Sequence, residues 1–305
     1  MDITATSNQM IILFLLLVVR FAANKTGLMN AAFNKAFSGL IINVTAPALI
    51  LYSVMDGEKV LNIWEILMLL GASLISLLLV IALAALFPKL LNMGQREGNT
   101  FRFMVIFSNT AFMGFPVVAA LMGTDALFYA AIFNIPGSIM MFSYGVHLLS
   151  GKSTEGGFLK LLLSPCIIAA VLALILYLVP ITVPGQIVET LGYLSAITVP
   201  GAMLILGSSL ALIPLKSVFL DWRVYVLSLI KLILLPVIFW LITRLLPLPD
   251  LIGQLTVIMW ALPVATNSTM LATQYGGDEA LSSKGVLITT LLSVVIIPIM
   301  MRVLY

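Results

Sequence analysis

Long apolar segments separated by short polar connections are the feature that most constrains this chain. A helix needs about 20 mostly apolar residues to cross the hydrocarbon core of a bilayer, and ten segments come close to that length. They cover residues 9–24, 35–54, 63–87, 101–122, 126–149, 158–179, 188–213, 222–246, 251–275 and 280–303. Only 9% of the residues are charged, whereas a soluble domain carries about 25%. The sequence therefore predicts an all-α integral membrane protein with ten transmembrane helices.

The positions of Lys and Arg predict the orientation of these helices. Basic residues gather in every second connection, starting with the first, as at Lys25, Arg96 and Lys152. Because cytoplasmic loops carry the excess of Lys and Arg, we expect these connections inside and both termini outside the cell membrane. The basic residues are dispersed rather than clustered, so membrane lipid is an expected partner and nucleic acid is not.

Two pairs of similar segments lie about half a chain apart. Asn43–Pro47 resembles Ala196–Pro200, and Gly123–Leu127 resembles Gly277–Leu281. Two matches at the same displacement indicate duplication, and a copy of five helices must be inverted relative to the other. Inverted repeats are typical of secondary transporters. The predicted parts are a first repeat, a short cytoplasmic linker and a second, inverted repeat, at residues 1–150, 151–157 and 158–305.

The fourth and ninth predicted helices each contain a proline in a polar surrounding. Pro116 lacks an amide donor, so it is expected to break helix four and free the carbonyl of Phe112. Pro263 falls near the middle of helix nine and precedes four polar side chains. Broken helices at matching places in two repeats indicate a transport site, and half-helix N-termini favour an anion. A proline kink that serves packing alone remains the alternative for each helix.

The candidate substrate-binding residues lie on these two helices and on two others. They are Asn109, Thr110, Gly114, Pro116, Asn134, Pro263, Thr266, Asn267, Ser268 and Lys231. Lys231 is the charged residue deepest in a predicted span, where a cation costs about 3 kcal/mol, so a functional role competes with snorkelling to the headgroups. Asn134 is as well suited to a contact between helices as to a substrate contact.

Several kinds of chemistry have no residues to support them. Cys166 is the single cysteine, so neither an intrachain disulfide nor a cysteine-based metal site can form. The sequence has no glycine-rich phosphate loop and no nucleophile or metal constellation. We therefore expect no enzymatic activity, no cofactor and no bound metal, while H⁺ or Na⁺ as a coupling ion stays open.

Several short motifs together resemble the auxin efflux carrier family, which joins bacterial malate and malonate permeases with plant PIN-FORMED carriers. The resemblance covers nearly the whole chain, and its motifs are Val44–Leu49, Ser108–Thr110, Met113–Pro116, Lys231 with Pro236, Ala261–Pro263, Gln274–Tyr275, and Asp278–Gly285 ahead of Pro298. Only a short segment joins the halves, so a prokaryotic permease is the closer type. Lys231 stands where related sequences often have arginine, so a bidentate carboxylate contact is not implied.

The resemblance implies a fold like that of sodium/proton antiporters or bile acid transporters, with broken helices 4 and 9 crossing each other. It implies a scaffold domain of helices 1, 2, 6 and 7 and a transport domain of helices 3–5 and 8–10. It also implies a homodimer through the scaffold and an elevator-type movement of the transport domain.

Three functions therefore compete. The first is a secondary transporter or uniporter of a small organic anion, a carboxylate. The second is a cation/proton antiporter or sodium-coupled symporter on the same fold; an antiporter would need carboxylates deep in the membrane, and the predicted spans offer none there. The third is a receptor or enzyme that transports nothing. The sequence names neither the substrate nor the direction of flux.

Overall fold

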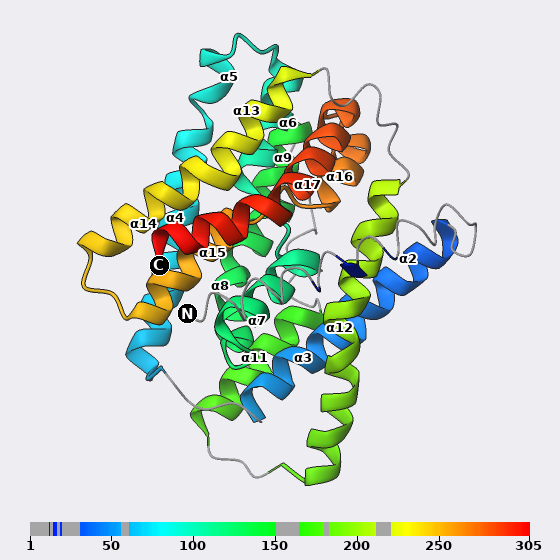
Figure 1. Cartoon of the computed structure of the whole chain (residues 1–305), viewed down its shortest axis with the longest axis vertical. Helices are drawn as coiled ribbons and strands as arrows, with labels where there is room; N and C mark the ends of the chain where they lie inside the picture. Colours follow the sequence, from blue (N-terminus) through cyan, green and yellow to red (C-terminus); the bar gives the residue numbers. More distant parts are fainter. Residues whose placement is uncertain are drawn as a thin grey trace. The chain divides into compact units, whose positions relative to one another are not determined.

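A computed structural model describes residues 12, 15–16, 19, 31–55, 61–150, 165–179, 183–211 and 221–305 (Figure 1). Most of the first predicted span and all of the linker at 151–157 lie outside these residues. The described elements are α2 Ala31–Leu40, η1 Ile41–Thr45, α3 Ala46–Met55, α4 Ile63–Ala84, α5 Phe87–Leu90, α6 Gln95–Ile106, η2 Thr110–Gly114, α7 Phe115–Met122, α8 Ala126–Met140, η3 Met141–Gly145, α9 Val146–Ser150, α11 Pro165–Leu178, α12 Gly185–Ala211, α13 Trp222–Leu229, η5 Ile230–Leu234, α14 Leu235–Leu245, α15 Asp250–Ala261, α16 Asn267–Tyr275 and α17 Glu279–Leu304, where η marks a π-helical turn.

Six of the described helical stretches are long and apolar enough to cross a membrane. They are Ala36–Met55, Ile63–Leu90, Ala126–Ser150, Gly185–Ile205, Trp222–Leu245 and Glu279–Leu304, close to six of the predicted spans. Three shorter apolar helices cover Phe112–Met122, Pro165–Leu178 and Asp250–Ala261. The total of ten spans and the inversion of the two halves stay predictions.

The side chains of α4 are arranged inside out compared with those of a helix in water. Ser73 and Ser76 are buried, whereas Leu74, Ile75 and Leu78 are exposed. The Ser76 hydroxyl donates to the carbonyl of Ser73 at 2.9 Å, which pairs this buried polar group. Large apolar side chains face outward at low cost only where the surroundings are also apolar, so this pattern indicates contact with lipid.

Capping side chains fix where several helices begin. At α4 the Asn62 amide donates to Glu65 at 2.8 Å, while the Glu65 amide donates to the Asn62 side chain at 3.1 Å, a reciprocal capping box. Asp278 caps α17 by accepting from the Leu281 amide at 2.9 Å. Each cap pairs backbone donors that would otherwise be unsatisfied at the start of the helix.

Three π-helical turns end two residues before a proline. Pro47 follows η1, Pro116 follows η2 and Pro236 follows η5. Proline cannot donate to the carbonyl four residues earlier, so a wider turn lets neighbouring amides bond five residues back instead. Such bonds close η1 and η5, from the Ala46 amide to the Ile41 carbonyl and from Leu235 to Ile230. These prolines therefore widen their helices without breaking them.

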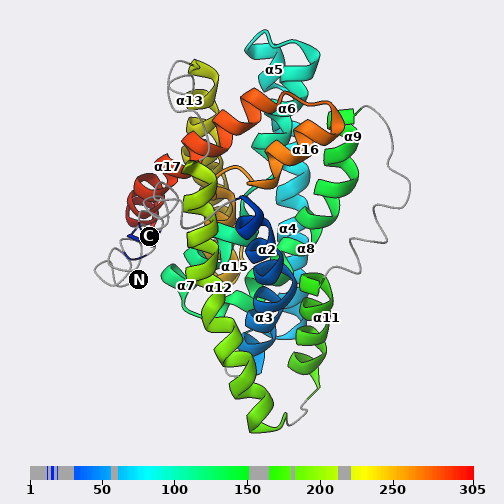
Figure 2. The ribbon, with the colours of Figure 1, turned by 90° about the vertical axis from the view of Figure 1, so that its right-hand side faces the viewer.

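The chain divides into two compact units by its internal contacts. Unit 1 comprises Met1–Leu69, Ala111–Phe133 and Leu162–Leu212. Within it α3 lies between α11 and α12, as both views show (Figures 1 and 2). Gly201 of α12 allows a close approach, because a Cβ there would lie 2.5 Å from the Cδ1 of Ile41. Ile41 also packs in an apolar cluster with Phe112, Ala202 and Ile205.

Unit 2 comprises Leu70–Thr110, Asn134–Leu161 and Ile213–Tyr305. Its last helix, α17, packs against α13, α16 and α6, and α14 packs against α15 (Figure 1). Gly285 in α17 permits this packing, since a Cβ there would lie 2.5 Å from the sulfur of Met104. The predicted division into a scaffold and a transport domain concerns function and stays a prediction.

Candidate functional site

Two helices of unit 2 are interrupted by extended backbone. The first is interrupted at residues 107–109, after α6 ends at Ile106. The second is interrupted at residues 262–266, between α15 and α16. We call residues 107–109 and 263–265 the crossing segments. The sequence predicted one interruption in each of these two helices, and the one in helix nine falls at Pro263, as expected.

The crossing segments pair with each other. Ser108 and Val264 form an antiparallel bridge. The Asn109 amide donates to the Pro263 carbonyl at 2.8 Å, and the Ala265 amide donates to the Phe107 carbonyl at 3.1 Å. Extended backbone inside a membrane needs partners within the protein, because lipid offers none. Each broken helix therefore supplies the hydrogen bonds that the other one has lost.

A third helix supports this pairing through Thr289. Its hydroxyl accepts from the Val264 amide at 3.2 Å and donates to the Gly285 carbonyl at 2.7 Å. Thr289 is fully buried in α17, as is its neighbour Thr290. Thr289 is not among the residues predicted from the sequence, although two adjacent threonines in the middle of an apolar helix are a signal for a polar contact at that depth.

The predicted position of the break in helix four is wrong. Pro116 and Gly114 were expected to open the helix, but the interruption lies at residues 107–109, several residues earlier. Gly114 is the last residue of η2 and has helical angles, with φ −62° and ψ −54°. Pro116 lies in the first turn of α7, directly after η2, and this wider turn accommodates its missing amide. Both residues belong to unit 1, whereas the crossing segments belong to unit 2.

The other candidates on the two broken helices lie at or beside the crossing segments. Asn109 is buried, and the Thr110 amide donates to the Ser108 carbonyl at 2.9 Å. Thr266 and Asn267 are half-buried at the start of α16, and Ser268 is buried in its first turn. The hydroxyls of Ser108 and Ser268 are buried and have no hydrogen-bond partner among the described residues.

Asn134 is placed differently from these candidates. It lies in α8, and its side-chain amide donates to the Ser138 hydroxyl one turn later, at 3.1 Å. This bond stays within one helix, so it is not the contact between helices that was weighed for Asn134. Its role in substrate binding stays a prediction.

Lys231 lies in η5 and is fully buried. Its ammonium group donates to the carbonyl of Val105 at 2.9 Å and stands 5.4 Å from the ring centre of Trp260. Val105 precedes the first interruption by two residues, and Trp260 precedes the second by two. The snorkelling alternative therefore fails in this structure, because the side chain ends inside the protein against both broken helices.

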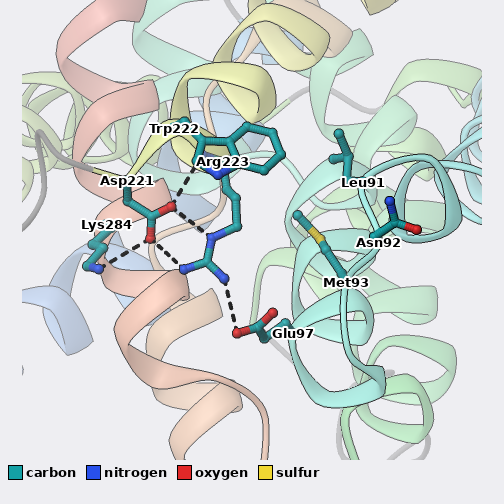
Figure 3. Close-up of a pocket in the computed structure, with 8 residues that line it drawn as sticks. All are labelled: Leu91, Asn92, Met93, Glu97, Asp221, Trp222, Arg223 and Lys284. Carbon is teal, nitrogen blue, oxygen red and sulfur yellow. Dashed lines mark hydrogen bonds and ion pairs between the residues drawn. The ribbon is translucent and has the colours of Figure 1, made fainter.

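A second group of charged residues lies at one end of unit 2, in a pocket of about 480 Å³ (Figure 3). Arg223 contacts Asp221 at 2.8 Å and Glu97 at 3.0 Å, and Lys284 contacts Asp221 at 3.3 Å. We call these four residues the terminal network. The bonds from Arg223 hold the pKa of Asp221 at about 2, below its ordinary 3.8, and the bond from Lys284 acts in the same direction. Its two cations face two anions, so it offers no excess charge to a substrate.

No group of acidic, histidine or cysteine side chains suited to a metal ion occurs among the residues that the structure describes. The candidate site thus consists of backbone groups, hydroxyls, the side-chain amide of Asn109 and the ammonium group of Lys231. Such groups can bind an anion by hydrogen bonds and charge, without covalent chemistry.

A model of the family described as membrane transport protein matches residues 5–157 and 153–301. The chain belongs to the auxin efflux carrier family of membrane transport proteins. A protein of Methanocaldococcus jannaschii described as an uncharacterized transporter is 25% identical over 295 residues, which cover 94% of this chain and 95% of that protein. A second such transporter, of Methanothermobacter thermautotrophicus, is 26% identical over 266 residues and 85% of each chain.

Membership in this family shows the coarse function and location. The chain is a multi-pass membrane protein of a transport family, and its described part is helical with several apolar spans. The family resemblance read from short motifs is thereby confirmed. Substrate, mechanism, assembly and orientation are finer matters that neither relative's description names.

Proposed function

We propose that this member of the auxin efflux carrier family carries a small organic anion, a carboxylate, which binds at the crossing segments of unit 2. The main support for the proposal is that two interrupted helices pair through hydrogen bonds from the backbone amides of Asn109 and Ala265. Interrupted helices that meet inside a transporter are where substrates bind in several such folds.

The charges around the crossing segments favour an anion. Helix α16 begins at Asn267, directly after its crossing segment, and the N-terminus of a helix carries a partial positive charge. Its capping residue Thr266 makes no side-chain bond to the helix, so that position leaves room for a ligand acceptor. The protonated Lys231 side chain adds a positive charge beside both broken helices. The Ser108 and Ser268 hydroxyls supply donors suited to carboxylate oxygens.

A cation/proton antiporter fits these residues less well. Among the described residues the buried charged side chains are Lys231 and Asp221, and Asp221 is paired in the terminal network. A cation/proton antiporter would need carboxylates deep in the membrane to carry its ions. We propose that transport is secondary. Uptake measured with an imposed H⁺ gradient, and separately with an imposed Na⁺ gradient, shows whether either ion is coupled to it.

The remaining parts of the proposal follow the family resemblance. Unit 2 contains the crossing segments and would move as the transport domain in an elevator-type cycle, and the scaffold domain would form a homodimer. The protein would lie in the cell membrane with both termini outside. Cysteines in 151–157 should then be labelled only from the cytoplasm, and a cysteine at Asp56 only from outside.

The experiment that tests the function combines binding with transport. Purified protein is screened by thermal shift against monocarboxylates and dicarboxylates, and labelled forms of the stabilising acids are offered to proteoliposomes. We expect saturable uptake of at least one acid that exceeds uptake into empty liposomes. Saturable transport of cations, with no response to any carboxylate, would contradict the proposal and favour the antiporter.

A further inference from the structure

We propose that Lys231 is the charge on which the membrane potential acts while the carrier is empty. This inference rests on the proposed function, because it requires unit 2 to move across the membrane with its crossing segments. It adds a physical role that substrate binding alone does not imply. The potential would set which side of the membrane the empty site faces.

Among the described residues, no acidic side chain compensates the charge of Lys231. The side chain is fully buried near the middle of the span Trp222–Leu245, about 14 Å along the helix from its start. Its ammonium group bonds to the Val105 carbonyl and faces the ring of Trp260, and both contacts stabilise a cation without cancelling its charge. No described acidic side chain forms an ion pair with Lys231.

The other charged residues that the structure describes in unit 2 lie near the ends of its helices, except Arg102 inside α6. Arg102 is half-buried, falls at the start of the predicted span 101–122 and donates to the Tyr144 hydroxyl at 2.8 Å. The terminal network holds two positive and two negative groups close together, at the starts of α6, α13 and α17. Arg244 and Arg302 fall in the last turns of α14 and α17. Charges at the water interface cross little of the electric field when a domain moves, so Lys231 carries most of the charge movement.

The direction of the effect follows from the sign of the charge. One positive charge that crosses the whole field shifts an equilibrium about fiftyfold per 100 mV, and a partial crossing shifts it less. A membrane that is negative inside therefore draws the empty site toward the cytoplasm. A bound singly charged anion neutralises Lys231, so the loaded step responds weakly to voltage. The empty carrier would then collect its substrate from the cytoplasmic side.

Voltage steps on the protein in a planar bilayer, without any substrate, test this inference. Wild type should give transient currents that saturate with voltage, as expected of a fixed charge that moves within the membrane. Lys231→Gln should reduce them to background. Lys89→Gln makes the same chemical change on an exposed side chain and should leave them unchanged. Lys231→Arg keeps the charge and should keep the currents, which guards against a Gln variant that does not fold.

The outcomes separate this inference from the proposed function. Transient currents that persist in Lys231→Gln, or their absence from wild type that takes up a carboxylate, would overturn the inference. Currents that depend on Lys231 in a protein that transports no carboxylate would support the role of the charge and contradict the proposed substrate class.

Discussion

The crossing segments and the terminal network are two polar regions of the same unit, and they satisfy their polar groups in opposite ways. In the terminal network four charged side chains neutralise one another near the water interface. At the crossing segments the backbone groups pair with each other, and the Lys231 ammonium group has a carbonyl and an aromatic ring as partners but no anion among the described residues. In the terminal network the positive and negative charges balance, whereas at the crossing segments the described residues supply a positive charge without a negative one.

This difference distinguishes polar groups that stabilise the fold from polar groups that serve transport. A buried charge without a counter-charge costs free energy, and a protein keeps one where its function needs it. A partly exposed network of paired charges adds a modest amount of stability and leaves nothing to bind. We therefore expect substitutions at the crossing segments to reduce transport more than stability, and substitutions in the terminal network to do the reverse.

The largest effect is expected for Lys231→Met. Methionine removes the cost of a buried cation and keeps an unbranched side chain, so the protein should insert and remain monodisperse. Carboxylate uptake into liposomes should nevertheless fall to background, because the bound anion loses its counter-charge. Lys89→Met serves as the surface control. Unchanged uptake kinetics in Lys231→Met would make this lysine a packing residue.

A somewhat smaller effect is expected for Asn109→Ala. The amide side chain at the first crossing segment offers a donor to a carboxylate oxygen, and loss of one bond to a charged group costs about 1.5–3 kcal/mol. Substrate affinity in a thermal-shift titration should fall roughly tenfold to hundredfold. Asn134→Ala, which removes a bond within α8, is the comparison. Equal losses in both variants would contradict a special role of the crossing segments.

Adjacent threonines allow a matched test of the support from α17. Thr289→Val leaves the buried Val264 amide without its acceptor, which costs about 1–3 kcal/mol. Thr290→Val makes the same change at an equally buried hydroxyl that has no partner among the described residues, so stability should stay constant or rise. Thermal unfolding in detergent measures both. Unchanged stability in Thr289→Val would contradict the support that Thr289 gives to the crossing segments.

The smallest effects are expected in the terminal network and concern stability alone. The pKa of Asp221 is lowered to about 2, so its contribution is present above its ordinary pKa of 3.8 and is lost as the pH falls from about 4 toward 2. Asp221→Asn should lower stability by about 1–2 kcal/mol at pH 6 and flatten the pH dependence between 4 and 2. Unfolding temperatures at several pH values give this curve.

Glu97→Gln tests the exposed part of the terminal network. The Glu97 side chain is 41% exposed in its ion pair with Arg223. An exposed pair contributes about 1 kcal/mol or less, so this variant should lie close to wild type. Both network variants should keep normal uptake. A loss of uptake in either one, at unchanged stability, would remove the distinction between the two regions.

Sequence reasoning succeeded where a single chemical property sets the structure. Six spans lie close to their predicted limits because apolar length alone decides whether a helix can cross a bilayer. The interruption at Pro263 was predictable because proline and four polar neighbours act together there. The interruption at residues 107–109 was not, since Pro116 marked the wrong place and a π-helical turn accommodates its missing amide.

The partners of the candidate residues could not be predicted, because they depend on tertiary packing. The bond from Lys231 to the Val105 carbonyl joins residues far apart in the chain and involves a backbone atom with no sequence signature. The same holds for the bond between the Asn109 amide and the Pro263 carbonyl. Residue type indicated which positions need polar partners, and only the fold shows which partners they have.

Substrate protection at the crossing segments tests the central claim most directly. Cys166 is first replaced by alanine, and Thr266→Cys is then introduced beside the second crossing segment, with Gln186→Cys at the exposed start of α12 in unit 1 as the control. A carboxylate that the protein transports should slow labelling of the cysteine at position 266 by a thiol reagent and leave labelling at position 186 unchanged. Equal labelling at position 266 with and without every transported acid would contradict the claim that the crossing segments bind the substrate.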